Sequence, residues 1–156
     1  MKRHLFLILA VFVVLAADSP KPDPREDAAA KELAKLQGKW KLVAEDSDGT
    51  VTETNQGAVI GFDKEFLIGY DGDGGVATKD TVKLNPTESP KEIDQTCVIN
   101  VLFPSEKGRI TPGIYELKDD KLKMAFPYAP NRERPKEFTT KKRSNFVVFT
   151  YKRTKS

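Results

Sequence analysis

The scarcity of histidine limits the chemistry of this chain more than any motif does. The only histidine, His4, lies in an N-terminal segment with the pattern of a cleavable export signal, so the chain after residue 17 has none. Without an imidazole the chain cannot build a Ser-His-Asp triad, a histidine acid–base pair or the common zinc sites. We therefore expect no metal, no cofactor and no catalytic residue.

A catalytic cysteine is equally unsupported. Cys97 is the only cysteine, so the chain cannot form an internal disulfide. A nucleophilic thiol needs a neighbouring base, and no histidine follows residue 17 to act as one. Thr96, Val98 and Ile99 surround it with the composition of a strand. We interpret Cys97 as a buried structural residue inside a strand.

Paired carboxylates are the remaining route to catalysis, because two acids in one cleft can hydrolyse glycosides. Glu45, Asp46, Asp94 and Glu116 lie in segments that predict strands. Carboxylates in strands usually point to the solvated face of the sheet. We therefore expect no catalytic pair, and a carboxylate-dependent hydrolase is the weakest alternative function.

The run DGDGG at residues 71–75 has part of the composition of a calcium loop. A helix–loop–helix calcium loop that began at Asp71 would need an oxygen ligand at its fifth position and a glutamate at its twelfth. Gly75 and Val82 occupy those positions. The run instead predicts a hairpin turn, in which glycine supplies positive φ angles.

The first 17 residues predict an export signal. Lysine, arginine and histidine at positions 2–4 precede an unbroken apolar run of eleven residues, 5–15. Such a run rises about 16 Å as a helix, roughly half of the hydrocarbon core of a bilayer, so it is too short to span. We expect cleavage after Ala16 or Ala17, export to the periplasm or the medium, and no stable membrane insertion afterwards. An uncleaved N-terminal anchor is the alternative.

The charge balance does not support a nucleic-acid partner. The 156 residues include 26 basic and 23 acidic side chains, for a formal net charge of +3. Removal of Lys2 and Arg3 with the signal lowers that charge to +1. Nucleic-acid-binding proteins usually carry a clear basic excess on one face, so we expect no such partner.

A polar segment and a short helix follow the signal. Residues 18–27 hold three prolines and six charged residues, a composition that cannot bury enough apolar surface to fold. Residues 28–36 are rich in helix formers and predict a helix that Gly38 ends. We therefore divide the chain into a signal peptide (1–17), a flexible leader (18–30) and one domain (31–156).

Short alternating segments separated by Gly, Asp, Asn and Pro fill the rest of the chain. The predicted strands are residues 40–44, 59–62, 66–70, 76–84, 93–103, 113–117, 121–126 and 146–153. Because short turns join them, consecutive strands should be antiparallel neighbours. We predict an all-β fold, an antiparallel up-and-down barrel of about eight strands with one short N-terminal helix. A two-sheet sandwich is the alternative.

The run Gly38-Lys39-Trp40 is the most informative local motif. It is similar to the Gly-x-Trp signature of lipocalin-like barrels. In that architecture the tryptophan closes one end of the barrel, and a basic residue near the end of the last strand packs across the indole. Arg153 or Lys152 can do so here, because a guanidinium over an indole gains cation–π attraction. The alternative is a tryptophan that serves only as a core anchor, and both interpretations make Trp40 structural.

Longer segments extend this resemblance. They are KELAKLQGKWKLV at residues 31–43, LNPTESPKEID at 84–94, GIYELKDDKLKMAF at 113–126, RPKEF at 134–138 and YKR at 151–153. In this order they resemble an uncharacterised, lipocalin-like small domain of exported planctomycete proteins. The resemblance implies the barrel and export, and it implies no activity. Met124 stands where members of that family often have cysteine.

These patterns lead to a hypothesis about function. We expect an exported, non-catalytic binding module whose barrel holds a small, mainly apolar ligand. The candidate interior positions are Leu42, Phe62, Ile114, Leu122, Met124, Phe126 and Phe149. The alternative is an interaction module that docks on a protein of the cell envelope, for which a large exposed apolar patch would be the sign.

Overall fold

The computed structural model describes residues 23–54, 57–129 and 133–154. The predicted signal peptide, its cleavage site and residues 18–22 of the predicted leader lie outside this part of the chain. The elements run α1 (Pro24–Leu36), β1 (Gly38–Ser47), β2 (Thr50–Glu53), β3 (Val59–Asp63), β4 (Phe66–Tyr70), β5 (Val76–Asn85), β6 (Lys91–Asn100), the 3₁₀ turn η1 (Pro104–Glu106), β7 (Ile110–Lys118), β8 (Lys121–Pro127) and β9 (Phe146–Arg153).

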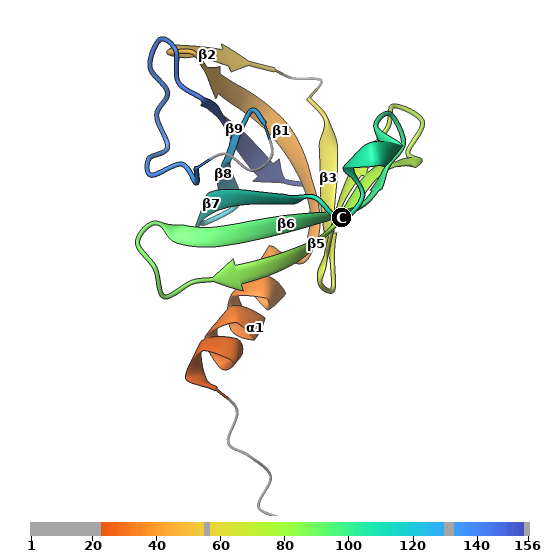
Figure 1. Cartoon of the computed structure of the whole chain (residues 1–156), viewed down its shortest axis with the longest axis vertical. Coiled ribbons are helices and arrows are strands. Elements are labelled where there is room, and N and C mark those ends of the chain that lie inside the picture. Colours follow the sequence, from red (N-terminus) through yellow and green to blue (C-terminus); the bar gives the residue numbers. More distant parts are fainter. Residues whose placement is uncertain (1–22, 55–56, 130–132, 155–156) are drawn as a thin grey trace, which may run out of the picture.

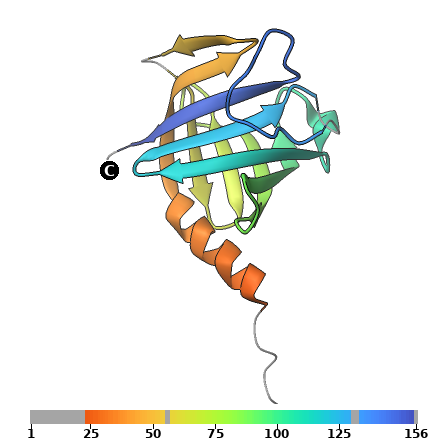
Figure 2. The same ribbon diagram turned by 90° about the vertical axis from the view of Figure 1, so that its left-hand side faces the viewer.

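The strands form a closed barrel (Figures 1 and 2). They pair in the order β2-β1-β3-β4-β5-β6-β7-β8-β9, and every pairing is antiparallel. The last strand also pairs with the first, from Trp40 opposite Arg153 to Ser47 opposite Val147. This pairing closes β1 and β3–β9 into an eight-stranded ring and removes its open edges. The predicted up-and-down barrel is confirmed.

The main differences from the predicted strands are an additional strand, β2, and an earlier end of β6. Strand β2, at Thr50–Glu53, was not expected, because all four of its residues are exposed and show no apolar alternation. It pairs only with residues 44–47, the second half of β1, and it is not part of the ring. Strand β6 ends at Asn100, so residues 101–103 of the predicted strand belong to a loop.

The helix begins earlier than predicted, at Pro24 rather than residue 28. Asp23 caps it, since its carboxylate accepts a hydrogen bond of 2.8 Å from the backbone N–H of Arg25. A proline suits the first helical position, where its fixed φ angle is already helical and the missing N–H has no helical partner to lose. The assignment of residues 24–30 to a flexible leader is therefore wrong.

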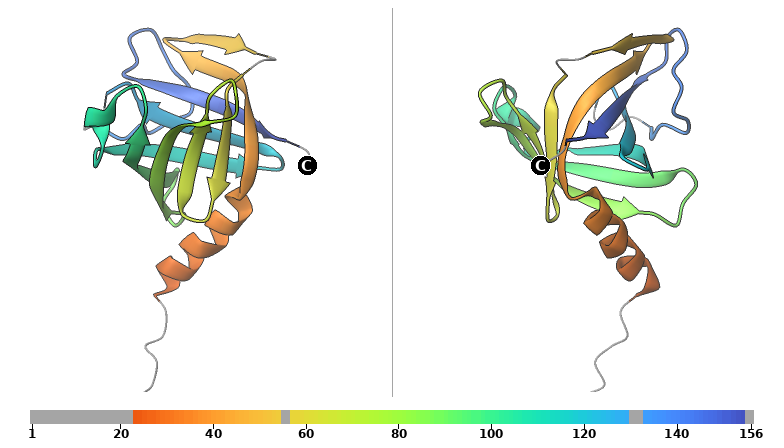
Figure 3. Two further views of the ribbon diagram at one scale, coloured as in Figure 1. Left: turned by 90° about the vertical axis from the view of Figure 1, so that its right-hand side faces the viewer. Right: turned by 180° about the vertical axis from the view of Figure 1, so that it is seen from behind.

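Helix α1 packs under one end of the barrel, called here the helix end (Figure 3). Glu32 fastens it there, because its buried carboxylate bonds Lys35 of the helix at 2.7 Å and Lys91 of β6 at 2.8 Å. Burial alone would raise the pKa of Glu32, but the hydrogen bonds from the two lysines outweigh burial and hold that pKa below its ordinary value.

An apolar core fills the helix end. Its buried members are Leu36 of α1 together with Trp40, Ile60, Phe62, Leu67, Leu84, Ile93, Tyr115, Leu122, Met124, Phe126 and Tyr151 of the strands. Every strand of the ring contributes a residue to this core. Loss of any one strand would therefore expose core residues of the other strands to water. The helix and all eight strands of the ring therefore share one hydrophobic core.

Trp40 closes the helix end, as the Gly-x-Trp motif predicts. Its indole is fully buried, and its N–H donates a 2.8 Å hydrogen bond to the carbonyl of Leu36. Arg153, rather than Lys152, lies across the indole, with the guanidinium carbon 4.0 Å from the ring centroid. The same guanidinium donates to the carbonyls of Gln37 at 2.7 Å and Lys35 at 2.8 Å.

A glycine is required where the helix turns into β1. Gly38 has a φ of +104°, which side chains with a Cβ rarely adopt. The guanidinium of Arg153 lies against this glycine, 3.6 Å from where a Cβ would be, which is an ordinary contact distance. The last turn of α1, Gly38, Trp40 and Arg153 are thus in contact with one another, and we call this group the plug.

We predict that Arg153→Ala lowers the free energy of unfolding by about 2–3 kcal/mol, because it removes one cation–π contact and two charge-assisted hydrogen bonds. Arg153→Lys should recover about half of that loss, since it keeps the charge without the planar fork. Urea unfolding can be followed by the fluorescence of Trp40, the single tryptophan.

The matched control for this prediction is Lys152→Ala. Lys152 is the exposed neighbour on the same strand, so its removal should change stability by less than about 0.5 kcal/mol. Equal destabilisation by Arg153→Ala and Lys152→Ala would contradict the role given to Arg153.

Candidate functional site

Six of the seven candidate interior residues lie on the inner face of the barrel. Phe62, Leu122, Met124 and Phe126 belong to the buried core. Leu42 and Phe149 are partly buried and pack against that core. Most of these side chains therefore fill the barrel instead of lining free space, and they do not by themselves form a ligand site.

The seventh candidate, Ile114, lies on the outer face, so its predicted interior position is wrong. Its neighbour Tyr115 points into the core, so Ile114 points outwards. There it packs with Ala125, Val148 and the partly buried Phe138 in a second, smaller cluster on the outside of the wall. Because the long β8–β9 connection covers this face, an outward position is apolar here, and strand alternation alone could not separate the two faces.

Glu45 points into the barrel, against the expectation for a strand carboxylate. A bulge lies between Leu42 and Ala44 in the pairing of β1 with β9. The bulge reverses the alternation, so that Glu45 stands opposite Phe149, an inward side chain. Without the bulge, Asp46 would have taken the inner face.

Asp80 is the second inward carboxylate. It stands opposite Leu67 of β4, which belongs to the core, and two positions from Val82, which packs against the core. No sequence motif marks this residue. Counting back in steps of two from Leu84 would have found it, because residues at even spacing on one strand share a face.

Four uncharged side chains on the same part of the inner face lie near these two acids. Thr78 stands opposite Gly69, Gln95 opposite Val82, and Cys97 opposite Asp80, while Thr111 of β7 stands opposite Gln95. Together with Glu45 and Asp80 they form what we call the polar cup, which lies in the half of the barrel away from α1.

The six side chains of the polar cup make no hydrogen bond or ion pair with the part of the protein that the structure describes. All six are partly exposed, and the described residues contain no fully buried side-chain nitrogen or oxygen without a hydrogen bond. These side chains face the inside of the ring in its half away from α1, and their partial exposure leaves them accessible to solvent.

Asp80 and Cys97 have shifted acidities. Burial in the barrel raises the pKa of Asp80 to about 6. Burial and the carboxylates of Asp80 and Glu106 raise the pKa of the Cys97 thiol above its ordinary value. A raised pKa disfavours the thiolate. Cys97 is partly exposed, which corrects the expectation of full burial.

The other acidic residues considered from the sequence have structural partners or face solvent. Asp46 accepts hydrogen bonds from the backbone N–H and hydroxyl of Thr140, and Asp94 pairs with Arg134 at 2.8 Å. Glu116 is exposed on the outer face. Asp71 accepts hydrogen bonds from the backbone of its own turn, including one of 2.6 Å from Gly75. Among the described residues no group of three or more His, Cys, Asp and Glu could hold a metal ion.

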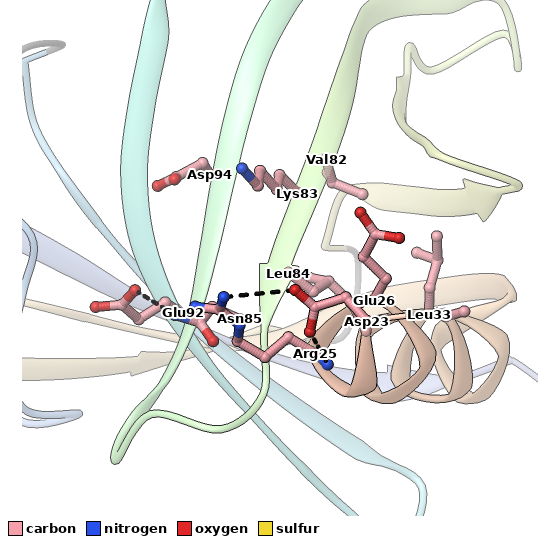
Figure 4. Close-up of a pocket in the computed structure, with 12 residues that line it drawn as sticks. Asp23, Arg25, Glu26, Leu33, Val82, Lys83, Leu84, Asn85, Glu92 and Asp94 are labelled. Carbon is pink, nitrogen blue, oxygen red and sulfur yellow. Dashed lines mark hydrogen bonds and ion pairs between the residues drawn. The ribbon is translucent and has the colours of Figure 1, made fainter. Parts of the chain in front are cut away.

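A cleft of about 620 Å³ lies between the N-terminal half of α1 and strands β5 and β6 (Figure 4). Ala29, Leu33 and Leu84 give it an apolar floor. Its charged rim is largely paired within the protein, as Figure 4 shows for Arg25 with Asp23. The polar cup, whose acids have no internal partner, is therefore the stronger candidate site.

Comparison with known proteins does not place the chain in a family. No family model matches it, and no curated protein is significantly similar to it. One solved structure that it resembles is an uncharacterized protein from Bacteroides eggerthii DSM 20697. That structure is 17% identical, with a TM-score of 0.46, and the match covers 76% of this chain and 99% of that chain. No helix among the described residues is long and apolar enough to cross a membrane.

We predict that Asp80→Asn stabilises the protein at pH 8 by about 1–2 kcal/mol. A shift of one pKa unit corresponds to about 1.4 kcal/mol, and partial exposure of the carboxylate reduces the full effect. Because the folded pKa of about 6 lies above the ordinary 3.8, ionised Asp80 destabilises the fold above pH 6. The penalty fades as the pH falls from 6 towards 4, so the two proteins should then be almost equally stable.

Chemical denaturation at pH 8, 6 and 4 measures this difference. Glu116→Gln is the matched control, because it removes an exposed outward carboxylate and should show no such pH dependence. Destabilisation by Asp80→Asn at pH 8 would show that the carboxylate has a stabilising partner, contrary to the polar cup described above.

Proposed function

We propose that this chain is an exported, non-catalytic binding module that holds a small ligand in the polar cup. The observation that carries the proposal is the inward, partly buried carboxylate of Asp80, which has no hydrogen-bond or ion-pair partner among the described residues. A carboxylate in such surroundings destabilises the free protein. A ligand that supplies a positive charge would remove this penalty.

The chemistry of the cup changes the expected ligand class. A mainly apolar ligand would leave Asp80, Glu45 and Gln95 without partners, which costs free energy. A small amphipathic cation fits better, with its charged group at Asp80 and its apolar part against the partly buried Phe149 and Leu42. Glu45 lies opposite Phe149 and is close enough to contribute to the raised pKa of Tyr151, after the larger effect of burial.

We propose binding instead of hydrolysis because neither acid has a partner among the described residues that would set it up for catalysis. A glycosidase needs two carboxylates that converge on one bond, about 5–9.5 Å apart. Glu45 lies on β1 and Asp80 on β5, with β3 and β4 between these strands in the ring. Export and the planctomycete family resemblance remain proposals that rest on the N-terminal pattern and the motifs of the sequence.

A set of three six-carbon probes tests the ligand class by calorimetry. We expect hexylamine to bind at pH 7.5, hexanol to bind at least about tenfold more weakly, and hexanoate not to bind, because only the amine offers a cation to Asp80. Asp80→Asn should weaken hexylamine binding about tenfold, whereas the control Glu116→Gln should leave it unchanged. Equal binding of amine and alcohol would refute the proposal.

The same binding should depend on pH with a defined sign. Protonation removes the negative charge of Asp80 as the pH falls through about 6. Because the amine stays protonated over this range, its affinity should fall several-fold between pH 7.5 and pH 5. In Asp80→Asn this dependence should disappear. Native mass spectrometry of the protein from its producing cells can then identify a co-purifying natural ligand.

A further inference from the structure

A second feature of the molecule, the loop between β6 and β7, exposes apolar side chains to water. Val101 is 61%, Leu102 80% and Phe103 61% exposed. Figures 1 and 2 show this loop projecting from the barrel, well away from α1. Together with the exposed residues Val76, Ile99 and Ile110 of the adjoining strands, these three form what we call the apolar rim.

The loop holds this exposed conformation through several backbone contacts. The N–H of Val101 donates to the carbonyl of Ala77 at 3.0 Å, and the N–H of Phe103 donates to the side chain of Asn100 at 2.9 Å. The end of the loop is held to β6 by Gly108, whose N–H donates to the carbonyl of Cys97 at 2.8 Å. These hydrogen bonds hold the loop in the conformation that exposes its apolar side chains.

A bulge in β6 enlarges the rim. The pairing of β5 with β6 shifts between Lys79 and Asp80, whose partners are Ile99 and Cys97. The shift turns Ile99 outwards although Cys97, two residues earlier, points inwards. An isoleucine that regular alternation would place inside the barrel thus joins the exposed surface.

We propose that the apolar rim docks the protein on a lipid bilayer, with Val101, Leu102 and Phe103 inserted at the boundary of headgroups and acyl chains. The rim protrudes, and a protruding tip of three successive apolar residues can enter a bilayer to the shallow depth of interfacial segments, about 5–10 Å. Stable protein interfaces instead use about 20–30 residues on each side, far more than the six of the rim.

The charges of the loop agree with a bilayer. Arg109 is paired with Glu106, which leaves Lys107 as the one loop cation without an ion-pair partner among the described residues. Lys107 can contact a phosphate headgroup, but the adjoining β4–β5 turn carries the exposed Asp71 and Asp73, so charge adds little to docking. Docking should therefore depend mainly on apolar insertion and only slightly on salt.

Fluorescence quenching tests this insertion in the full chain. Phe103→Trp places an indole at the tip, whereas the native Trp40 is fully buried at the helix end and provides the background signal in the wild type. On phosphatidylcholine vesicles we expect the Phe103→Trp emission to shift to the blue and to fall at least about twofold when the acyl chains are brominated. Leu102→Ser in this background should weaken the quenching.

The matched control is Val51→Trp, at an equally exposed valine (64%) on β2 outside the rim. It should not be quenched on the same vesicles. This comparison reports insertion of the rim even if the apolar residues 5–15 also hold the chain on the vesicle, because quenching depends on which side chain enters the bilayer.

Several outcomes would overturn the proposal. Unchanged Phe103→Trp emission on vesicles that sediment with the protein would show that the rim stays in water. Equal quenching of Val51→Trp would show that the rim has no special part in docking. A blue shift without lipid that grows with protein concentration would assign the rim to a second copy of this chain. A shift with delipidated envelope proteins alone would assign it to a protein partner.

Discussion

The pairing of the first strand with the last determines most of what this protein can do. Once β1 bonds to β9, the eight strands have one inner face and one outer face, and every side chain is committed to one of them. Closure also brings Arg153, near the end of the described chain, onto Trp40 and the last carbonyls of α1. The plug at the helix end therefore exists only because the ring is closed.

The two halves of the barrel have different inner faces: one holds the apolar core and the other holds the polar cup. Around Trp40 the inner face is apolar and buried, and Glu32 holds the helix against it with two lysines. In the other half the inner face carries Glu45 and Asp80, which are partly exposed. A protein can keep unpaired acids inside a barrel only if the rest of its core compensates for their cost, and the packed helix end meets that need.

Departures from regular alternation create the features that bear on function. The bulge in β1 turns Glu45 inwards, and the shift in the pairing of β5 with β6 turns Ile99 outwards. Each reverses what a two-residue period would predict, so Glu45 instead of Asp46 faces the inside of the barrel and Ile99 faces outwards. The polar cup and the apolar rim both lie in the half of the molecule that these irregularities shape, away from the plug.

The sequence alone predicted the alternating strands, the helix before them and the Gly38–Trp40 motif, because these depend on local patterns and turn residues. It favoured a barrel over a sandwich, but closure of the ring and the contact of Arg153 with Trp40 depend on the pairing of β1 with β9. It could also have shown Asp80 on an inner face by counting along one strand. Only the tertiary structure decided the sides of Glu45, Ile99 and Ile114. Bulges arise from how two strands fit together, and the cover over an outer face arises from a distant loop, so neither leaves a local trace in the sequence.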